Sequence, residues 1–233
     1  MLDRILSYRE MCDEENAQTL QRGMNFRLNP RYSLILMSQR SNAPYQDRIL
    51  DDGITIEYEG HDEPRTSPGT NPKVLDQPRF TRNGTLTQNG HFANTVEECK
   101  KEKSEPELVK VYEKILPGVW SLKGFFELAD YEIRNDGERN VFVFILKLKE
   151  NQNFGDTTEG YGLISAKHNR LIPTQVKKDV WQRDKGRCVL CGSNKNLHFD
   201  HDLPFSKGGT SLIAKNIRLL CAKCNLAKSD KIE

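Results

Sequence analysis

Two stretches near the C-terminus decide how this chain is organised: RCVLCGSNKNLHFDHDLPFSKGGT at residues 187–210 and LCAKCNLAKS at residues 220–229. Each contains one Cys-x-x-Cys pair, and the four cysteines are Cys188, Cys191, Cys221 and Cys224. Four thiolates in two such pairs are the ligand set of a closed, tetrahedral structural zinc site. The 29 residues between the pairs, 192–220, exceed the roughly 15–20 of a simple zinc ribbon. The spacing therefore predicts a zinc-stapled module with a further element inserted between its pairs.

That inserted element resembles the working part of the HNH (ββα-metal) nuclease family. The resemblance is carried by Asp200-His201, by the intervening Asn216, and by a Cys-Asn-x-x-Lys ending that contains Asn225 and Lys228. These motifs follow one another in the order that the family has. Many members carry His at the last motif position, where this chain has Asn225, and an amide oxygen remains a competent ligand for a hard ion.

The resemblance implies a metal-dependent phosphodiesterase site. Asp200 and Asn225 would give oxygen ligands to one hard divalent ion, Mg²⁺ or Mn²⁺, which would neutralise charge on the scissile phosphate. His201 would be the general base on the attacking water, a role that suits a neutral imidazole near pH 7. Asn216 would brace the loop that holds His201, and Lys228 would contact phosphate.

The overall composition is that of an ordinary water-soluble protein. The chain has 233 residues, 36% of them hydrophobic, with a mean hydropathy of −0.70. It has no run of about 18 apolar residues and no secretory layout at its N-terminus, so we expect a cytoplasmic protein without a membrane partner. Residues 171–233 carry 12 Lys+Arg against 6 Asp+Glu, a net charge of +6, and the rest of the chain carries −4. A basic C-terminal module suits a phosphate-binding surface.

Most of the chain before this module has the pattern of β-strands. Short apolar or alternating runs predict strands, and Asn135-Asp-Gly predicts a hairpin turn. The expected strands are residues 31–37, 54–59, 108–115, 120–130 and 140–149. Residues 1–22 and 85–103 are expected to hold helices, residues 60–84 a long loop, and a further helix is expected to run from Pro173 to about Lys185.

Within the β region, three short motifs resemble the signature of SRA (YDG) domains. They are Tyr45-Gln-Asp47, Asp51-Asp-Gly53 and Tyr58-Glu-Gly, and the later strand segments 108–112, 120–131 and 141–148 match that family in order. Domains of this family flip a modified cytosine, typically 5-methylcytosine, out of the duplex into an aromatic pocket.

The SRA resemblance implies a set of base-binding residues. Tyr45 and Tyr58 would stack on the flipped base, Asp47 would read its Watson–Crick edge, and backbone groups of Glu59 and Gly60 would add contacts. The spacing between the first Tyr and the Gly is one residue longer here than in the family. Asp51 or Asp52 therefore stays open as an alternative to Asp47.

Together these patterns predict an α+β chain in four parts. We expect an N-terminal helix that packs or dimerises (residues 1–24), an SRA/PUA-like curved β-barrel (25–149), a polar Gly-rich linker (150–170), and a small zinc-stapled ββα-metal (HNH) domain (171–233). The expected function is that of a modification-dependent restriction endonuclease acting on double-stranded DNA that carries 5-methylcytosine or 5-hydroxymethylcytosine.

Some alternatives remain open on the sequence. One HNH site cuts one strand, so a double-strand break would need a homodimer or two binding events. The chain could also be a non-catalytic reader of modified DNA, although such a reader has no need of Asp200, His201 and Asn225 together. The third alternative is an HNH nuclease whose β domain binds protein or RNA.

Overall fold

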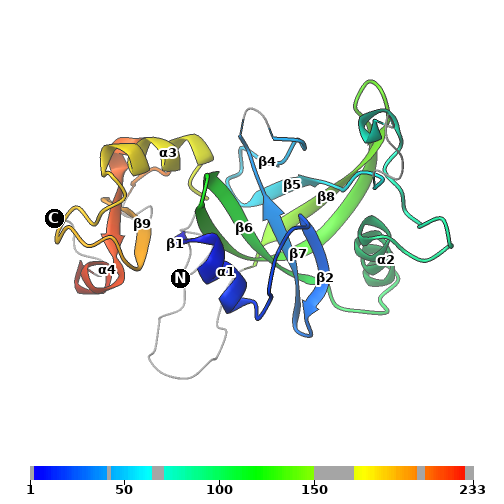
Figure 1. Ribbon diagram of the computed structural model, residues 1–233, viewed down its shortest axis with the longest axis horizontal. Coiled ribbons are helices and arrows are strands. Elements are labelled where there is room, and N and C mark those ends of the chain that lie inside the picture. The colour runs from blue at the N-terminus through cyan, green and yellow to red at the C-terminus, as the bar shows by residue number, and fades with distance from the viewer. Residues whose placement is uncertain (1–2, 41–42, 65–70, 150–170, 204–207, 229–233) are drawn as a thin grey trace.

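The computed structural model describes residues 3–40, 43–64, 71–149, 171–203 and 208–228, and within them the chain has an α+β fold (Figure 1). The strands are β1 (Arg4–Leu6), β2 (Met24–Asn29), β3 (Tyr32–Met37), β4 (Arg48–Ile49), β5 (Thr55–Glu59), β6 (Leu108–Leu116), β7 (Val119–Asn135), β8 (Asn140–Leu148), β9 (Leu197–His201) and β10 (Ile217–Cys221). The α-helices are α1 (Tyr8–Glu14), α2 (Gln88–Lys100), α3 (Thr174–Arg183) and α4 (Ala222–Lys228), with 3₁₀ turns η1 (Pro72–Val74) and η4 (Ala214–Asn216). No α-helix of these residues is long and apolar enough to cross a membrane.

One sheet runs through the whole of this structure. Its order is β10-β9-β1-β7-β6-β3-β2, with β8 paired to β7 and β5, and β5 paired to β4. Among the strand pairs of the described residues, only β3–β6 is parallel. We call β2 to β8 with α2 the β domain, and α3, β9, η4, β10 and α4 the C-terminal module. Figure 1 shows the C-terminal module at one end of the molecule, with β1 between it and the β domain.

The β domain curves around its own core, and glycine makes one of the bends possible. Gly124 lies opposite Val111 at a register shift between β6 and β7 and has φ of 112°, a backbone conformation that favours glycine. A second register shift lies between Leu128 and Asp130 of β7. The curved strands enclose apolar side chains from β3, β5, β6, β7 and β8, and Phe92 and Val96 of α2 cover them.

The C-terminal module is a β-hairpin flanked by two helices. In the hairpin, His201 pairs with Ile217 and Leu197 with Cys221. Helix α4 begins directly after β10 and packs against both strands, while α3 packs on β10. The module's own apolar cluster includes Val176 and Val180 of α3, together with Cys188 and Cys221 from the two Cys-x-x-Cys pairs.

The N-terminal segment differs from the single helix expected for residues 1–22. Arg4–Leu6 is a strand, which pairs with β7 on one side and, through Arg4 and His198, with β9 on the other. Three residues are too few to show a strand period, which is why the sequence did not reveal it. Ser7 then starts α1 through a capping box with Glu10. Asn16, with φ of 51°, follows the end of this seven-residue helix.

Helix α1 packs on the β domain. Met11 and Cys12 are buried in a cluster that also contains Leu34, Trp120 and Leu122. In β1, successive side chains point to opposite sides, so Ile5 packs against the cluster of the C-terminal module and Leu6 against the cluster beneath α1. The N-terminal residues therefore join the two halves of the structure, a role that the sequence analysis did not assign to them.

Two other expectations need adjustment. Strands β2 and β4 were not expected. Leu171, the first residue assigned to the HNH domain, lies in the core of the β domain, and its amide donates to the carbonyl of Gly53. The C-terminal module's packing starts at Ile172. The expected linker, residues 150–170, lies outside the described residues.

Candidate functional site

The four cysteines of the two Cys-x-x-Cys pairs meet at one point. Their Sγ atoms all lie within 4.8 Å of one another, and the cysteines are not joined by disulfides. Cys191 Sγ and Cys221 Sγ are 3.6 Å apart, which fits two sulfurs on one tetrahedral zinc with Zn–S bonds of about 2.3 Å. The donor set and the spacing fit the structural zinc predicted from the sequence.

The pKa values of two thiols in this cluster are shifted in opposite directions. Burial raises the pKa of Cys188, but backbone amides of Cys221, Cys191 and Leu190 outweigh it and lower the value to about 6. The neighbouring thiols of Cys221 and Cys191, together with burial, raise the pKa of Cys224 to about 12. Four sulfurs this close cannot all ionise beside one another unless a positive ion compensates them.

The predicted general base lies at the end of β9. His201 is half-buried, and its Nε2 is 2.9 Å from the hydroxyl of Ser211. Burial lowers the pKa of His201, against the opposing effects of Asp3 and Asp200, so the imidazole is neutral near pH 7. If Nε2–H donates to Ser211, the lone pair of Nδ1 is left to accept a proton. Ser211 is itself buried and was not singled out in the sequence.

Lys228 points inward, toward Asp200, instead of outward toward a phosphate. Its ammonium is 2.5 Å from Oδ2 of Asp200 and also donates to the carbonyl of His201. The side chain of Lys228 is 2% exposed and that of Asp200 is 21% exposed. In this arrangement Lys228 orients Asp200.

Asn216 holds the loop that follows the Asp200-His201 pair. Its Nδ2 donates to the carbonyls of Leu203 at 3.0 Å and Thr210 at 2.9 Å, and its Oδ1 accepts from the Leu203 amide at 2.8 Å. These bonds fit the bracing role expected for it. Asn225 lies on α4, which packs across β9, so Asp200, His201 and Asn225 come from adjoining elements.

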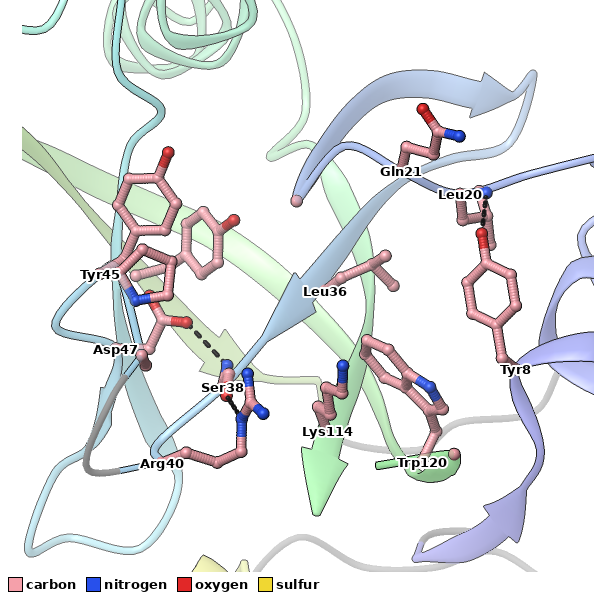
Figure 2. A pocket seen from close by; sticks show the side chains of 15 residues that line it. Tyr8, Leu20, Gln21, Leu36, Ser38, Arg40, Tyr45, Asp47, Lys114 and Trp120 are labelled. Carbon is pink, nitrogen blue, oxygen red and sulfur yellow. Dashed lines mark hydrogen bonds between the residues drawn. The ribbon is translucent and has the colours of Figure 1, made fainter. Parts of the chain in front are cut away.

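A second site is a cavity of about 480 Å³ on the β domain. Three of the predicted base-binding residues, Tyr45, Asp47 and Tyr58, line it. Figure 2 shows Tyr45 and Asp47 on one side and Trp120 and Tyr8 on the other. The structure thus brings together two aromatic rings that lie 13 residues apart in sequence and an acid that lies between them in the chain.

Asp47 is held rigidly at the wall of this cavity. Its Oδ2 accepts from the amide of Ser38 at 2.9 Å, and its Oδ1 accepts from the amide of Glu59 at 3.2 Å. Burial raises its pKa from 3.8 to about 7, against the lowering effect of these two amides. The alternative acid Asp52 instead caps the turn before β5 through Thr55 and Ile54, and neither Asp51 nor Asp52 is among the described residues that line the cavity.

The two tyrosines are fixed in different ways. The ammonium of Lys73 lies 4.2 Å from the ring centroid of Tyr45, a cation–π contact, and is paired with Asp62 at 3.1 Å. Tyr58 is buried in strand β5. A Cβ at Gly23 would come within 2.5 Å of the Tyr58 hydroxyl, so glycine leaves room for that ring.

The backbone groups of Glu59 and Gly60, expected to contact the base, are engaged within the β domain. The Glu59 amide is already bonded to Asp47. The Gly60 amide donates to the carbonyl of Phe142, and the Gly60 carbonyl accepts from Gln77. Neither residue is among the described residues that line the cavity. Strand pairing explains why these backbone groups are already bonded, because β5 pairs with β8 and Gln77 bonds both Gly60 and Phe142.

Several lining residues were missed from the sequence, among them four with aromatic or positively charged side chains: Tyr8, Arg40, Lys114 and Trp120. Lys114 lies 5.6 Å from the Trp120 ring centroid, and the Tyr8 and Trp120 rings are 6.4 Å apart. They come from α1, the segment after β3, and the β6–β7 hairpin, so only the fold brings them together. Arg40 and Lys114 give the cavity positive charge.

The raised pKa of Asp47 predicts a pH dependence of stability. A carboxyl whose pKa is higher in the folded chain contributes stability that is full below its ordinary pKa, near 3.8, and is lost as the pH rises through about 7. This difference corresponds to at most roughly 4 kcal/mol. We expect the free energy of unfolding of Asp47→Asn to fall less between about pH 5 and pH 8 than that of the wild type.

Urea unfolding followed by circular dichroism across this pH range measures the effect. Asp51→Asn, at an exposed turn position, is the matched control. Its free energy of unfolding should change with pH in parallel with that of the wild type. Parallel curves for Asp47→Asn and the wild type would show that the Asp47 carboxyl titrates normally.

Comparison with known proteins identifies the C-terminal module. Residues 188–231 match the family of HNH endonucleases. This match includes both cysteine pairs and the Asp200-His201, Asn216 and Asn225 positions, and it confirms the resemblance found in the sequence for this part of the chain. No curated protein matches the sequence.

Several solved structures are similar in fold to a larger part of the chain. The SUVH5 SRA domain in complex with hemimethylated CG DNA is 17% identical, with a TM-score of 0.43, over 65% of this chain and 90% of that one. KRYPTONITE in complex with mCHH DNA, an H3(1–15) peptide and SAH is 16% identical, with a TM-score of 0.42, over 68% of this chain and 33% of that one. Arabidopsis thaliana SUVH6 in complex with SAM is 17% identical, with a TM-score of 0.43, over 76% of this chain and 28% of that one. The first of these is described as an SRA domain.

Proposed function

We propose that this chain is a modification-dependent DNA endonuclease. Its β domain takes a flipped 5-methylcytosine or 5-hydroxymethylcytosine into the cavity, and its C-terminal module hydrolyses a phosphodiester bond nearby. The observation that carries the proposal is a single cavity lined by Tyr45, Tyr58 and Asp47 on the same chain as an HNH match that retains Asp200 and His201.

In the cavity, the residues divide the work of recognition. A flipped base needs a π-face to replace the stacking lost from the duplex, worth about 1–3 kcal/mol per base. Lys73 occupies one face of Tyr45, which leaves the other face for the base. Asp47 would accept a hydrogen bond from the amino group of cytosine, and Arg40 and Lys114 would pair with the phosphates of the flipped nucleotide.

In the C-terminal module, the residues prepare water for attack. A divalent ion such as Mg²⁺ or Mn²⁺, bound by Asp200 and Asn225, would neutralise charge that builds up on the phosphate. Nδ1 of His201 would remove the proton from the water, with Ser211 holding Nε2. Lys228 would keep the carboxylate of Asp200 in place, and Asn216 would hold the loop.

Cleavage of matched DNA tests the proposal. Plasmids that differ only in carrying cytosine, 5-methylcytosine or 5-hydroxymethylcytosine are incubated with the zinc-loaded protein and Mg²⁺ or Mn²⁺. We expect cleavage of one or both modified plasmids and little cleavage of the unmodified one. Equal cleavage of all three would contradict modified-base reading, and binding of modified DNA without any cleavage would favour the non-catalytic reader.

A variant of the cavity sharpens this test. Tyr45→Ala removes one stacking ring from a segment outside the strands, and a loss of about 1–3 kcal/mol corresponds to an affinity for modified duplex about 5- to 150-fold weaker. Phe80→Ala is the matched control, because Phe80 is an exposed aromatic residue that does not line the cavity. Fluorescence anisotropy with modified and unmodified duplexes measures the DNA affinity of both variants. An unchanged preference in Tyr45→Ala would show that the base does not bind at this ring.

A further inference from the structure

A cluster of buried charges lies where the β domain meets the C-terminal module. Glu113 of β6, Lys123 of β7 and Lys177 of α3 have side chains that are 0% exposed, and Asp3 is also buried. Lys123 Nζ is 2.9 Å from Glu113 Oε2, and Lys177 Nζ is 3.4 Å from the same oxygen and bonds Asp3. Two positive and two negative groups are thus removed from water together.

Three members of this cluster have shifted pKa values. Burial lowers the pKa of Lys123 to about 8. For Lys177 the effect of burial is outweighed by Asp3 and Glu113, which raise its pKa. Burial raises the pKa of Glu113, but Lys123 and Lys177 outweigh it, and the net shift is downward. The net shifts of Glu113 and Lys177 thus both favour their ionised forms.

Further bonds tie the cluster to both halves of the structure. Lys123 donates to the carbonyl of Ile172 at 3.0 Å, and Lys177 to the hydroxyl of Ser121 at 2.8 Å. The hydroxyl of Thr174, at the start of α3, contacts Glu113 and lies 2.6 Å from Oε1 of Gln39. The contacts of α3 with the β domain at this boundary are therefore largely polar and directional.

Both candidate sites adjoin this cluster. On the cavity side, Gln39 lies between Ser38, which bonds Asp47, and Arg40, which lines the cavity. On the other side, the carbonyl of Asp3 accepts from the amide of Phe199, the residue before Asp200. The ammonium of Lys177 also lies 5.5 Å from the Phe199 ring centroid. Asp47 in the cavity and Asp200 on β9 are thus each linked to the same charged cluster through a few intervening residues.

Buried ions are a poor way to gain stability, because the loss of hydration offsets their attraction. Their geometry is demanding, however, since each charge left without its partner in a dry site is costly. Apolar surfaces of similar area can slide over one another, whereas this set of bonds is satisfied in one relative position of the two halves. Such a cluster suits a junction that must keep one geometry.

We propose that the Asp3–Glu113–Lys123–Lys177 cluster fixes the position of the C-terminal module relative to the base cavity, and so determines which phosphodiester is cut. This inference rests on the proposed function for its consequence on DNA, but the rigid junction itself can be tested without DNA. Lys177 is then a positioning residue that acts at a distance from the reacting atoms.

The test uses Lys177→Met, which keeps a long side chain and removes the charge. Amide hydrogen exchange of the free zinc-loaded protein reports on the junction, and we expect the Phe199 amide to exchange about tenfold faster or more, with core amides such as Val111 unchanged. On a duplex with one modified cytosine, the wild type should cut at one or two adjacent bonds. The variant should spread its cuts over several neighbouring bonds while retaining affinity for the modified base.

Two further variants make the result decisive. Lys149→Met removes an ion pair with Glu127 in which both side chains are over a third exposed, and it should leave exchange and cut positions unchanged. If Lys177→Met alone does not fold, Asp3→Asn with Lys177→Met keeps the charges balanced and should still show fast Phe199 exchange and dispersed cuts.

Unchanged exchange and unchanged cut positions in the folded variant would overturn the inference. Wild-type protein that cuts modified and unmodified DNA alike would instead overturn the proposed function. In that case the exchange measurement still decides whether the cluster fixes the junction.

Discussion

His201→Ala should reduce DNA cleavage by a factor of about 10²–10⁴, the usual contribution of a general base, and leave the affinity for modified duplex unchanged. His201 lies at the end of β9 beside Asp200, and its neutral imidazole is oriented by the Ser211 hydroxyl. Alanine removes the proton acceptor and leaves the bracing bonds of Asn216 in place. Single-turnover cleavage with excess enzyme measures the loss separately from binding.

A second histidine variant tests whether the loss of any imidazole from this protein would reduce cleavage. His91 lies on α2, where its ring stacks on Phe26 at 5.0 Å; His91→Ala should therefore keep wild-type cleavage. Thermal unfolding of both variants checks that the C-terminal module is intact. Undiminished cleavage by a folded His201→Ala protein would show that another group activates the water.

The sequence predicted those parts of the fold that local pattern specifies. The alternating run at residues 54–59 became β5, and Asn135-Asp-Gly became the turn between β7 and β8, where Asn135 pairs with Asn140. The Cys-x-x-Cys spacing predicted four sulfurs that the fold does bring together. In each case neighbouring residues carry enough information, because the backbone period or the ligand geometry is satisfied locally.

Contacts between distant segments were the part that sequence could not predict. Nothing in Arg4–Leu6 indicates that this strand joins β7 to β9. Lys114 and Trp120 line the cavity only because β6 and β7 pair in a particular register. A lysine such as Lys177 or Lys228 is expected in solvent, and its burial follows from acids that other segments bring to it.

The same limit explains why the predicted base-binding residues do not all lie at the cavity. Tyr45, Asp47 and Tyr58 were placed by a motif whose side chains face one cavity. Glu59 and Gly60 were assigned through backbone groups, and these are the groups that strand pairing uses first. A motif locates side chains more securely than it locates free amides, because the pairing of a strand depends on its neighbours.

Removal of zinc should unfold the C-terminal module and abolish cleavage, while the β domain still binds modified duplex. Cys188 and Cys221 belong to the module's apolar cluster, beside Ile217 and Leu219, so a metal held by the four cysteines would join residues on which the module packs. Apparent zinc binding contributes about 10–16 kcal/mol in small zinc-folded peptides at neutral pH. A module of this size has little apolar core to replace that amount.

The measurement is calorimetry with and without a strong chelator, with metal content followed directly. We expect a separate low-temperature transition for the zinc-free module, and Cys221→Ser should reproduce it in the presence of zinc. Cys99→Ser, at a half-buried cysteine on α2 outside the cluster, should behave as the wild type. Because the thiols must lose protons to bind the metal, zinc should also be released more readily as the pH falls. A zinc-free protein that unfolds and cuts as the loaded protein does would show that the four cysteines hold no structural ion.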